Sequence, residues 1–245
     1  MKKESYLAET KILNFKNENI QSLIKQRGWQ KLSEFEKIGA AYAFVKDEIR
    51  FGYNKSDDLS ASEVLLDGYG QCNTKGNLLM ALLRALHIPC RFHGFTIKQA
   101  LQKGAIPVYL IWFVPKYIIH SWVEVHYDNK WINLEGFILD RDYLCAIQNK
   151  YSTTTSSFCG YGIATNCLSS PKVEWEGTDT YIQKEGIHDD YGIFNSPDEF
   201  YQQKGTNLSG IKRFLYSNVL RHLVNRNVNR LRSRFGNKSE AHAQS

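Results

Sequence analysis

A leucine-rich segment followed abruptly by β-type segments is the feature that most constrains the fold of this chain. Residues 73–87 have apolar side chains around most of a helical circumference, which predicts a buried helix that ends before Pro89. Beyond it, residues 90–97, 108–114, 120–127 and 130–135 are rich in aromatic and β-branched residues and predict strands. Helices first and an antiparallel sheet afterwards predict an α+β domain.

Helical periodicity also marks the region before the leucine-rich segment. Apolar residues recur at three- and four-residue steps over residues 18–50, and Gly28 interrupts them, which predicts two amphipathic helices. A short helix is expected around residues 60–66. Residues 148–196 contain a Ser/Thr run and scattered glycines and are expected to form ordered loops, and Ser196 followed by Pro197 predicts the start of another helix.

Basic residues are concentrated near the C-terminus. The 245-residue chain has a net charge of +6, but residues 211–245 hold eight Lys or Arg and one acid, so residues 1–210 hold 23 basic and 24 acidic residues. We therefore predict a domain over residues 1–196, with its core at about 35–140, and a basic helical extension over 197–245 that packs on it. The extension is a candidate element for an anionic partner, nucleic acid or membrane; solvated arginines on a packed helix are the alternative.

Location and cofactors follow from what the sequence lacks. The N-terminus shows no secretory signal, and the longest apolar runs fall short of the ~18 residues that a membrane span requires, so a cytoplasmic protein without a transmembrane segment is expected. The five cysteines include no Cys-x-x-Cys pair. His87, Cys90 and His93 do not match a common zinc spacing either, and we predict no metal and no other cofactor.

Cys72 stands where a glycine-containing loop meets the leucine-rich helix. Unpaired N–H groups and the helix dipole favour a thiolate there, and the Cys72 N–H can contribute to an oxyanion hole. Gln71 could donate to the same oxyanion, although a residue next to the nucleophile usually points away from it. Tyr69 and Trp122 are candidates for shaping a substrate groove.

A hairpin over residues 120–135 supplies partners for this cysteine. If Asp128-Asn129 forms its two-residue turn, residue numbers of paired positions sum to 257, and Trp122 lies opposite Glu135. Glu135 then lies diagonal to His120, on the face opposite to the apolar core side chains of the hairpin. A cysteine at a helix N-terminus with a histidine and a carboxylate is the arrangement that nucleophilic acyl transfer needs.

Several motifs in order strengthen this interpretation: Gly70-Gln71-Cys72, Ile88-Pro89-Cys90-Arg91, His120-Ser121-Trp122-Val123-Glu124-Val125, and Trp131 with a carboxylate four residues later. Together they resemble the core of the transglutaminase-like superfamily over about residues 35–140. The resemblance implies a papain-like fold, with Cys72 as nucleophile, His120 as base and Glu135 as third member of a triad. The family usually has aspartate at the last position, and Asp140 is a less favoured alternative carboxylate.

The sequence thus predicts an enzyme with a Cys-His-Glu triad that forms a thioester on an amide or peptide substrate. Water as the acceptor gives a peptidase or amidase, and an amine gives a transamidase. The alternative is a noncatalytic protein-interaction module that retains the superfamily core.

Overall fold

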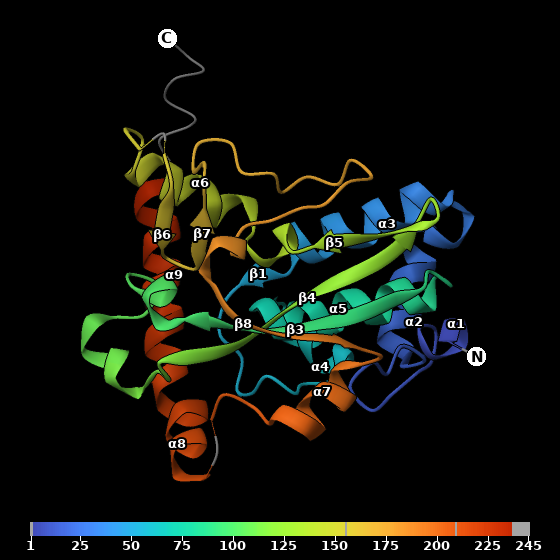
Figure 1. Cartoon of the computed structure of the whole chain (residues 1–245), viewed down its shortest axis with the longest axis horizontal. Coiled ribbons are helices and arrows are strands. Elements are labelled where there is room, and N and C mark those ends of the chain that lie inside the picture. The colour runs from blue at the N-terminus through green and yellow to red at the C-terminus, as the bar shows by residue number, and fades with distance from the viewer. Residues whose placement is uncertain (1, 155, 209, 237–245) are drawn as a thin grey trace.

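The computed structural model describes residues 2–154, 156–208 and 210–236 (Figure 1). A four-stranded antiparallel sheet has the order β5-β4-β3-β8. Its strands are β3 (Cys90–Lys98), β4 (Tyr117–Tyr127), β5 (Lys130–Leu134) and β8 (Ile187–Phe194). Two small pairs accompany it: β1 (Arg50–Phe51) with β2 (Tyr69–Gly70), and β6 (Phe158–Gly160) with β7 (Ile163–Thr165).

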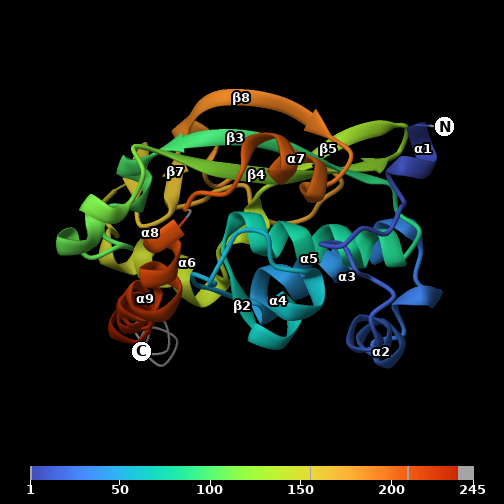
Figure 2. The same cartoon turned by 90° about the horizontal axis from the view of Figure 1, so that it is seen from below.

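Helices gather on one side of this sheet, as Figure 2 shows. The α-helices are α1 (Lys2–Ser5), α2 (Glu18–Gln26), α3 (Glu34–Ala43), α4 (Ala61–Asp67), α5 (Cys72–Ala85), α6 (Arg141–Lys150), α7 (Pro197–Lys204), α8 (Gly210–Leu215) and α9 (Arg221–Gly236). Short 3-10 helices are η1 (Trp29–Lys31), η3 (Gln99–Gln102), η4 (Val108–Phe113), η5 (Gly136–Ile138) and η6 (Lys184–Gly186), and η2 (Phe44–Glu48) and η7 (Tyr216–Leu220) are π-helical. The predicted α+β class is confirmed.

The leucine-rich helix is α5, and its prediction is confirmed. Nearly all of its residues are buried, and it lies against β4, with the β3–β8 side of the sheet above it (Figure 2). The two helices expected before it are α2 and α3, and Gly28 between them has a φ of +67°, a left-handed conformation that glycine adopts without strain. The short helix near residue 60 is α4, which Ser60 caps.

The β4–β5 hairpin has the predicted register. Val123 pairs with Leu134 and Val125 with Ile132, and all four side chains are buried in the core. Asp128 and Asn129 have φ values of +50° and +59°, which is the geometry of a type I′ turn. The local turn chemistry therefore sets which face of the hairpin each side chain occupies.

The strand predicted over residues 108–114 is wrong, because η4 occupies that segment. Pro107 and Pro115 bracket it, and the strands before and after it in the chain, β3 and β4, pair with each other rather than with this segment. Its backbone is satisfied locally instead, through Leu110 N–H to the Pro107 carbonyl at 2.8 Å and Val114 N–H to the Ile111 carbonyl at 3.1 Å.

The expectation of loops over residues 148–196 is also wrong in part. The end of α6, the β6–β7 pair and the whole of β8 lie in this region. β8 is an edge strand with mostly exposed side chains, and Asp189, Asp190 and Gly192 interrupt its apolar alternation. Pairing with β3 rather than its own hydrophobic pattern therefore makes it a strand.

The C-terminal segment forms the predicted helix. α8, η7 and α9 follow one another, and α9 packs against α6 (Figure 1). Arg232 on α9 forms an ion pair with Asp140 at 2.6 Å. The helix prediction is confirmed, whereas the domain boundary at residues 196 and 197 stays a prediction.

Candidate active site

Cys72 is the first residue of α5 and is largely buried. The tight turn before it depends on Gly70, where a Cβ would lie 2.8 Å from Thr74 Oγ1 and 2.9 Å from Lys75 Cγ. Gln71 is the N-cap, and its backbone N–H donates to Thr74 Oγ1 at 3.0 Å. The turn thus directs the Cys72 sulfur beyond the start of a helix, where N–H groups that lack intrahelical partners create a positive field.

His120 and Glu135 form a fully buried pair. Nε2 of His120 lies 2.9 Å from Oε1 of Glu135, and both side chains have zero exposure. The register of β4 and β5 explains the contact, because Glu135 directly follows the last strand residue, Leu134, and is diagonal to His120. The sequence predicted this diagonal placement.

The second carboxylate oxygen of Glu135 is bound by a loop. Oε2 accepts hydrogen bonds from three consecutive backbone N–H groups, those of Ile182 at 2.9 Å, Gln183 at 3.0 Å and Lys184 at 3.1 Å. This loop covers the hairpin face that the sequence assigned opposite to the core, so this face is buried too. Glu135 thus contacts the imidazole with one oxygen and the loop with the other. The extra methylene, relative to aspartate, gives the side chain the length to reach both.

His120 interacts electrostatically with Cys72 as well as with Glu135. Nδ1 is buried and has no hydrogen-bond partner of standard geometry among the described residues. Burial lowers the pKa of His120, but the charge and hydrogen bonding of Cys72, followed by those of Glu135, outweigh it and raise the pKa to about 9. The surroundings of His120 therefore favour the imidazolium form of its side chain.

This pKa gives a direct prediction. The His120 imidazole should remain protonated as the pH rises past 7 and lose its proton near pH 9. In Cys72→Ala the lowering effect of burial on the His120 pKa remains, while the charge and hydrogen bonding of Cys72 are gone, so the imidazole should deprotonate at lower pH. Histidine NMR resonances followed from pH 5 to 10 check this, with His120→Gln identifying the signal. An unchanged titration in Cys72→Ala would show that the sulfur does not act on the ring.

Gln71 contacts the Cys72 thiol through its amide oxygen, whereas an oxyanion donor would need to present its amide N–H₂ group. The thiol donates to Gln71 Oε1 at 3.2 Å, while Gln71 Nε2 donates to Asp57 Oδ1 at 2.8 Å. Because a carboxylate only accepts, Asp57 fixes the orientation of the Gln71 amide. The oxygen therefore faces the sulfur, and the amide N–H₂ group is held elsewhere.

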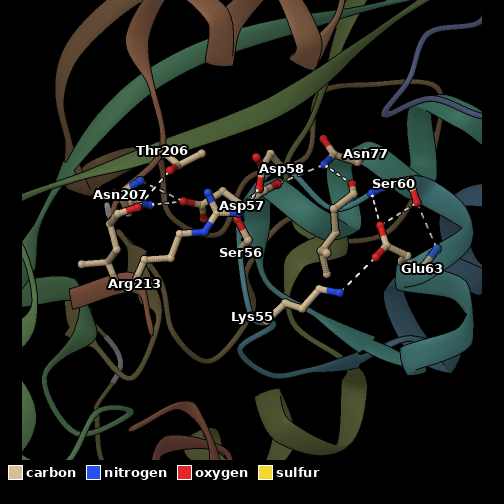
Figure 3. A network of polar contacts seen from close by, with 12 residues as sticks. Lys55, Ser56, Asp57, Asp58, Ser60, Glu63, Asn77, Thr206, Asn207 and Arg213 are labelled. Atoms are coloured by element: carbon tan, nitrogen blue, oxygen red, sulfur yellow. Dashed lines mark hydrogen bonds and ion pairs between the residues drawn. The ribbon is translucent and has the colours of Figure 1, made fainter. Parts of the chain in front are cut away.

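Asp57 is the centre of a polar network that the sequence did not predict (Figure 3). Besides Gln71, its carboxylate accepts from Asn73 Nδ2 at 3.2 Å and from Asn207 N and Nδ2, both at 3.0 Å. Asn207 in turn accepts from the backbone N–H of Ile119 at 2.7 Å, and Asn73 Nδ2 donates to the Ile119 carbonyl at 3.1 Å. The network thus joins the residues next to Cys72 to the residue before His120.

Only one part of this network had a signal in the sequence. Asn73 and Asn77 are polar residues on a helix that is otherwise apolar, and buried polar side chains need partners. Asp57 and Asn207 lie in loops with no periodicity, so nothing local predicts that they meet.

The remaining candidates lie away from the sulfur or have other partners. Tyr69 accepts from Arg221 at 2.9 Å, and Trp122 packs against Phe95 and Tyr181 on the covered outer face of the sheet. The alternative carboxylate, Asp140, caps α6 and binds Arg232, and desolvation by burial, which raises its pKa, is outweighed by Arg232, which lowers it. His93 contacts Glu124 at 2.7 Å and Asp190 at 2.8 Å.

Comparison with known proteins gives one family-model match and a similar solved structure. Residues 23–136 match the family model of the transglutaminase-like superfamily. A solved structure from Cytophaga hutchinsonii, provisionally named a cysteine protease, is 13% identical, with a TM-score of 0.46; the match covers 80% of this chain and 48% of that one. This chain therefore spans about half the length of that protein. No curated protein matches the sequence.

The fold is thus α+β, as the sequence predicted, and its residues 23–136 are similar to the transglutaminase-like superfamily. The matched segment contains Cys72, His120 and Glu135 and ends directly after Glu135. The loop that binds Glu135 and the residue Asn207 lie outside the match. Among the described residues, no helix combines the length and the apolar character needed to cross a membrane.

Proposed function

We propose that this chain is a cysteine-dependent acyl-transfer enzyme acting on an amide or peptide substrate, with Cys72, His120 and Glu135 as its triad. The observation that carries the proposal is the buried His120–Glu135 pair, whose imidazole interacts electrostatically with a cysteine at a helix N-terminus. Burying an imidazole and a carboxylate costs desolvation free energy. A pair with a purely structural role would recover little of that cost, so its burial favours a catalytic role.

The reaction follows from these positions. The Cys72 proton passes to Nδ1 of His120, and the sulfur forms a bond to the substrate carbonyl carbon, whose π electrons move to oxygen. The negative oxygen is stabilised by backbone N–H groups at the start of α5. As the tetrahedral species collapses, the C–N bond breaks and the imidazolium protonates the leaving amine. Water or an amine, deprotonated by His120, then attacks the thioester and releases Cys72.

The Glu135 carboxylate acts through the histidine. By accepting from Nε2–H it keeps Nδ1 available for the sulfur proton and stabilises the imidazolium that forms. The three N–H groups on its other oxygen keep the carboxylate in place during this charge change. We therefore propose that glutamate functions here where the family usually has aspartate.

Selective labelling of Cys72 tests the proposal. Iodoacetamide should alkylate Cys72 at neutral pH about tenfold or more faster than a model thiol, because a thiolate is the reacting species. Mass spectrometry of tryptic peptides measures the rate, with Cys145, which is partly exposed and whose pKa burial raises, as an internal control. Labelling of Cys72 no faster than the model thiol would favour the noncatalytic interaction module instead.

A comparison of activities with and without Cys72 also identifies the acceptor of the acyl group. Parallel assays of amide hydrolysis and of amine incorporation, with Cys72→Ala as control, distinguish a hydrolase from a transamidase. The anionic partner of the basic segment stays a prediction: Arg221 and Arg232 bind Tyr69 and Asp140 within the protein, while Arg226, Arg230 and Arg234 are exposed. A cytoplasmic location likewise stays a prediction.

A further inference from the structure

An apolar pocket opens beside the proposed nucleophile. It has a volume of about 100 Å³ and lies between the loop that follows β1, the segment from η3 to the start of β4, and the C-terminal helices. Its apolar wall includes Ile106, Leu110, Val114, Ile118, Leu220 and Val224. The family match ends at residue 136, so η7 and α9 contribute a wall that the transglutaminase-like core does not contain.

Two of its lining residues connect this pocket to the triad. Gln71 lines it, and Gln71 Oε1 accepts from the Cys72 thiol at 3.2 Å. Ile118 belongs to β4, two residues before His120. A group bound in the pocket would therefore be adjacent to an acyl carbon at Cys72.

The polar groups at the inner end of the pocket are already engaged with one another. Gln71 Nε2 and Asn207 Nδ2 both donate to Asp57, and Tyr53 donates to Gln102. Figure 3 shows Asp57 and Asn207 oriented toward each other. At this end of the pocket a charged ligand group would have to break these bonds or be buried without a partner, whereas an apolar group would gain free energy from the apolar wall. Lys55 and Lys212 also line the pocket, and Lys55 forms an ion pair with Glu63 at 3.1 Å.

We infer that this pocket binds an apolar side chain of the acyl donor, of about the size of leucine, next to the carbonyl that Cys72 attacks. The inference rests on the proposed function and specifies its substrate class. A cavity of roughly 150 Å³ lined by Leu, Ile and Phe holds a benzene molecule, so the volume here suits an aliphatic side chain. It does not favour a charged side chain or the polar amide of a glutaminyl donor. Leu220 and Val224 are then specificity-determining residues.

Peptide vinyl sulfones that differ only in the residue bearing the electrophile test this inference. We expect the leucine probe to label Cys72 about tenfold or more faster than matched lysine, glutamate or glutamine probes, the selectivity that a few buried methylenes provide. Labelling by iodoacetamide, which is too small to need the pocket, reports on Cys72 independently. Similar rates for all probes, with iodoacetamide labelling still rapid, would overturn the pocket inference but not the proposed function.

A matched pair of variants on the C-terminal helices locates the determinant. Val224 is 2% exposed and lines the pocket, whereas Val219 is 49% exposed and does not. Val224→Phe should fill the pocket and abolish the leucine preference, while Val219→Phe should retain it, and both should react normally with iodoacetamide.

A second variant keeps the test valid if Val224→Phe does not fold. Leu110→Ala enlarges the pocket from the opposite side and should shift the preference from leucine toward phenylalanine probes. A leucine preference that persists in both Val224→Phe and Leu110→Ala would overturn the assignment. If iodoacetamide fails to label Cys72 rapidly in the wild-type protein, the proposed function fails, and the substrate assignment fails with it.

Discussion

Replacing Glu135 with glutamine is expected to lower kcat/KM about 10³-fold, although the two side chains have nearly the same shape. The three N–H groups of residues 182–184 require an acceptor, so the amide oxygen should take the place of Oε2. The amide N–H₂ group then faces Nε2 of His120 and forces the ring proton onto Nδ1. A neutral imidazole with its proton on Nδ1 cannot accept the proton of Cys72.

Two comparisons make this result specific. Glu124 is another buried carboxylate of the same sheet, which binds Arg91 and His93, and Glu124→Gln should reduce stability while leaving kcat/KM within a few-fold of wild type. Glu135→Asp should fall between wild type and Glu135→Gln, because the shorter side chain cannot reach both His120 and the loop. Thermal unfolding of each variant separates loss of fold from loss of chemistry. Wild-type kcat/KM in Glu135→Gln would contradict the tautomer role.

Replacing Asp57 with alanine is expected to lower the free energy of unfolding by about 3 kcal/mol. The buried carboxylate accepts four hydrogen bonds, from Gln71, Asn73 and two N–H groups of Asn207. Its removal leaves Gln71 Nε2 and the Asn207 backbone N–H without their acceptor, while the two Nδ2 groups retain only the Ile119 carbonyl. The same donors fix the turn before Cys72 and the backbone of Ile119 beside His120. Loss of Asp57 should therefore also reduce the rate at which Cys72 is alkylated.

The neighbouring residue provides the matched control. Asp58 is partly exposed and forms an ion pair with Arg213 at 3.2 Å, and Figure 3 shows it beside Asp57. Because exposed ion pairs contribute little, Asp58→Ala should cost less than about 1 kcal/mol. Urea unfolding of both variants measures the difference. Equal stability losses at the two positions would mean that the Asp57 network does not hold these segments together.

Elements whose signals are local were predicted correctly. The β4–β5 register followed from one turn dipeptide, and the residues flanking that turn alternate between apolar and polar. α5 followed from its apolar periodicity, and the helix start at Ser196 followed from its capping side chain. In each case the determining interactions lie within a few residues, where propensity and periodicity act.

Elements that depend on a distant neighbour were missed. η4 has the composition of a strand but pairs with no strand of the described residues, and β8 has the composition of a loop but pairs with β3. Strand formation depends on the partner as much as on the residues themselves. Periodicity cannot show whether an edge is available, so both assignments required the assembled sheet.

The sequence by itself determined that Cys72 begins a buried helix and that His120 and Glu135 share a face of one hairpin. Those relations depend on helical and strand periodicity, which are short-range properties of the chain. Only the tertiary structure decided that the face is covered, because the N–H groups on Glu135 come from residues 47 to 49 positions away. It also decided that Asp57 and Asn207 meet, 150 residues apart, and that the C-terminal helices close a pocket beside the thiol. Such contacts arise from packing of whole elements, which no local pattern specifies.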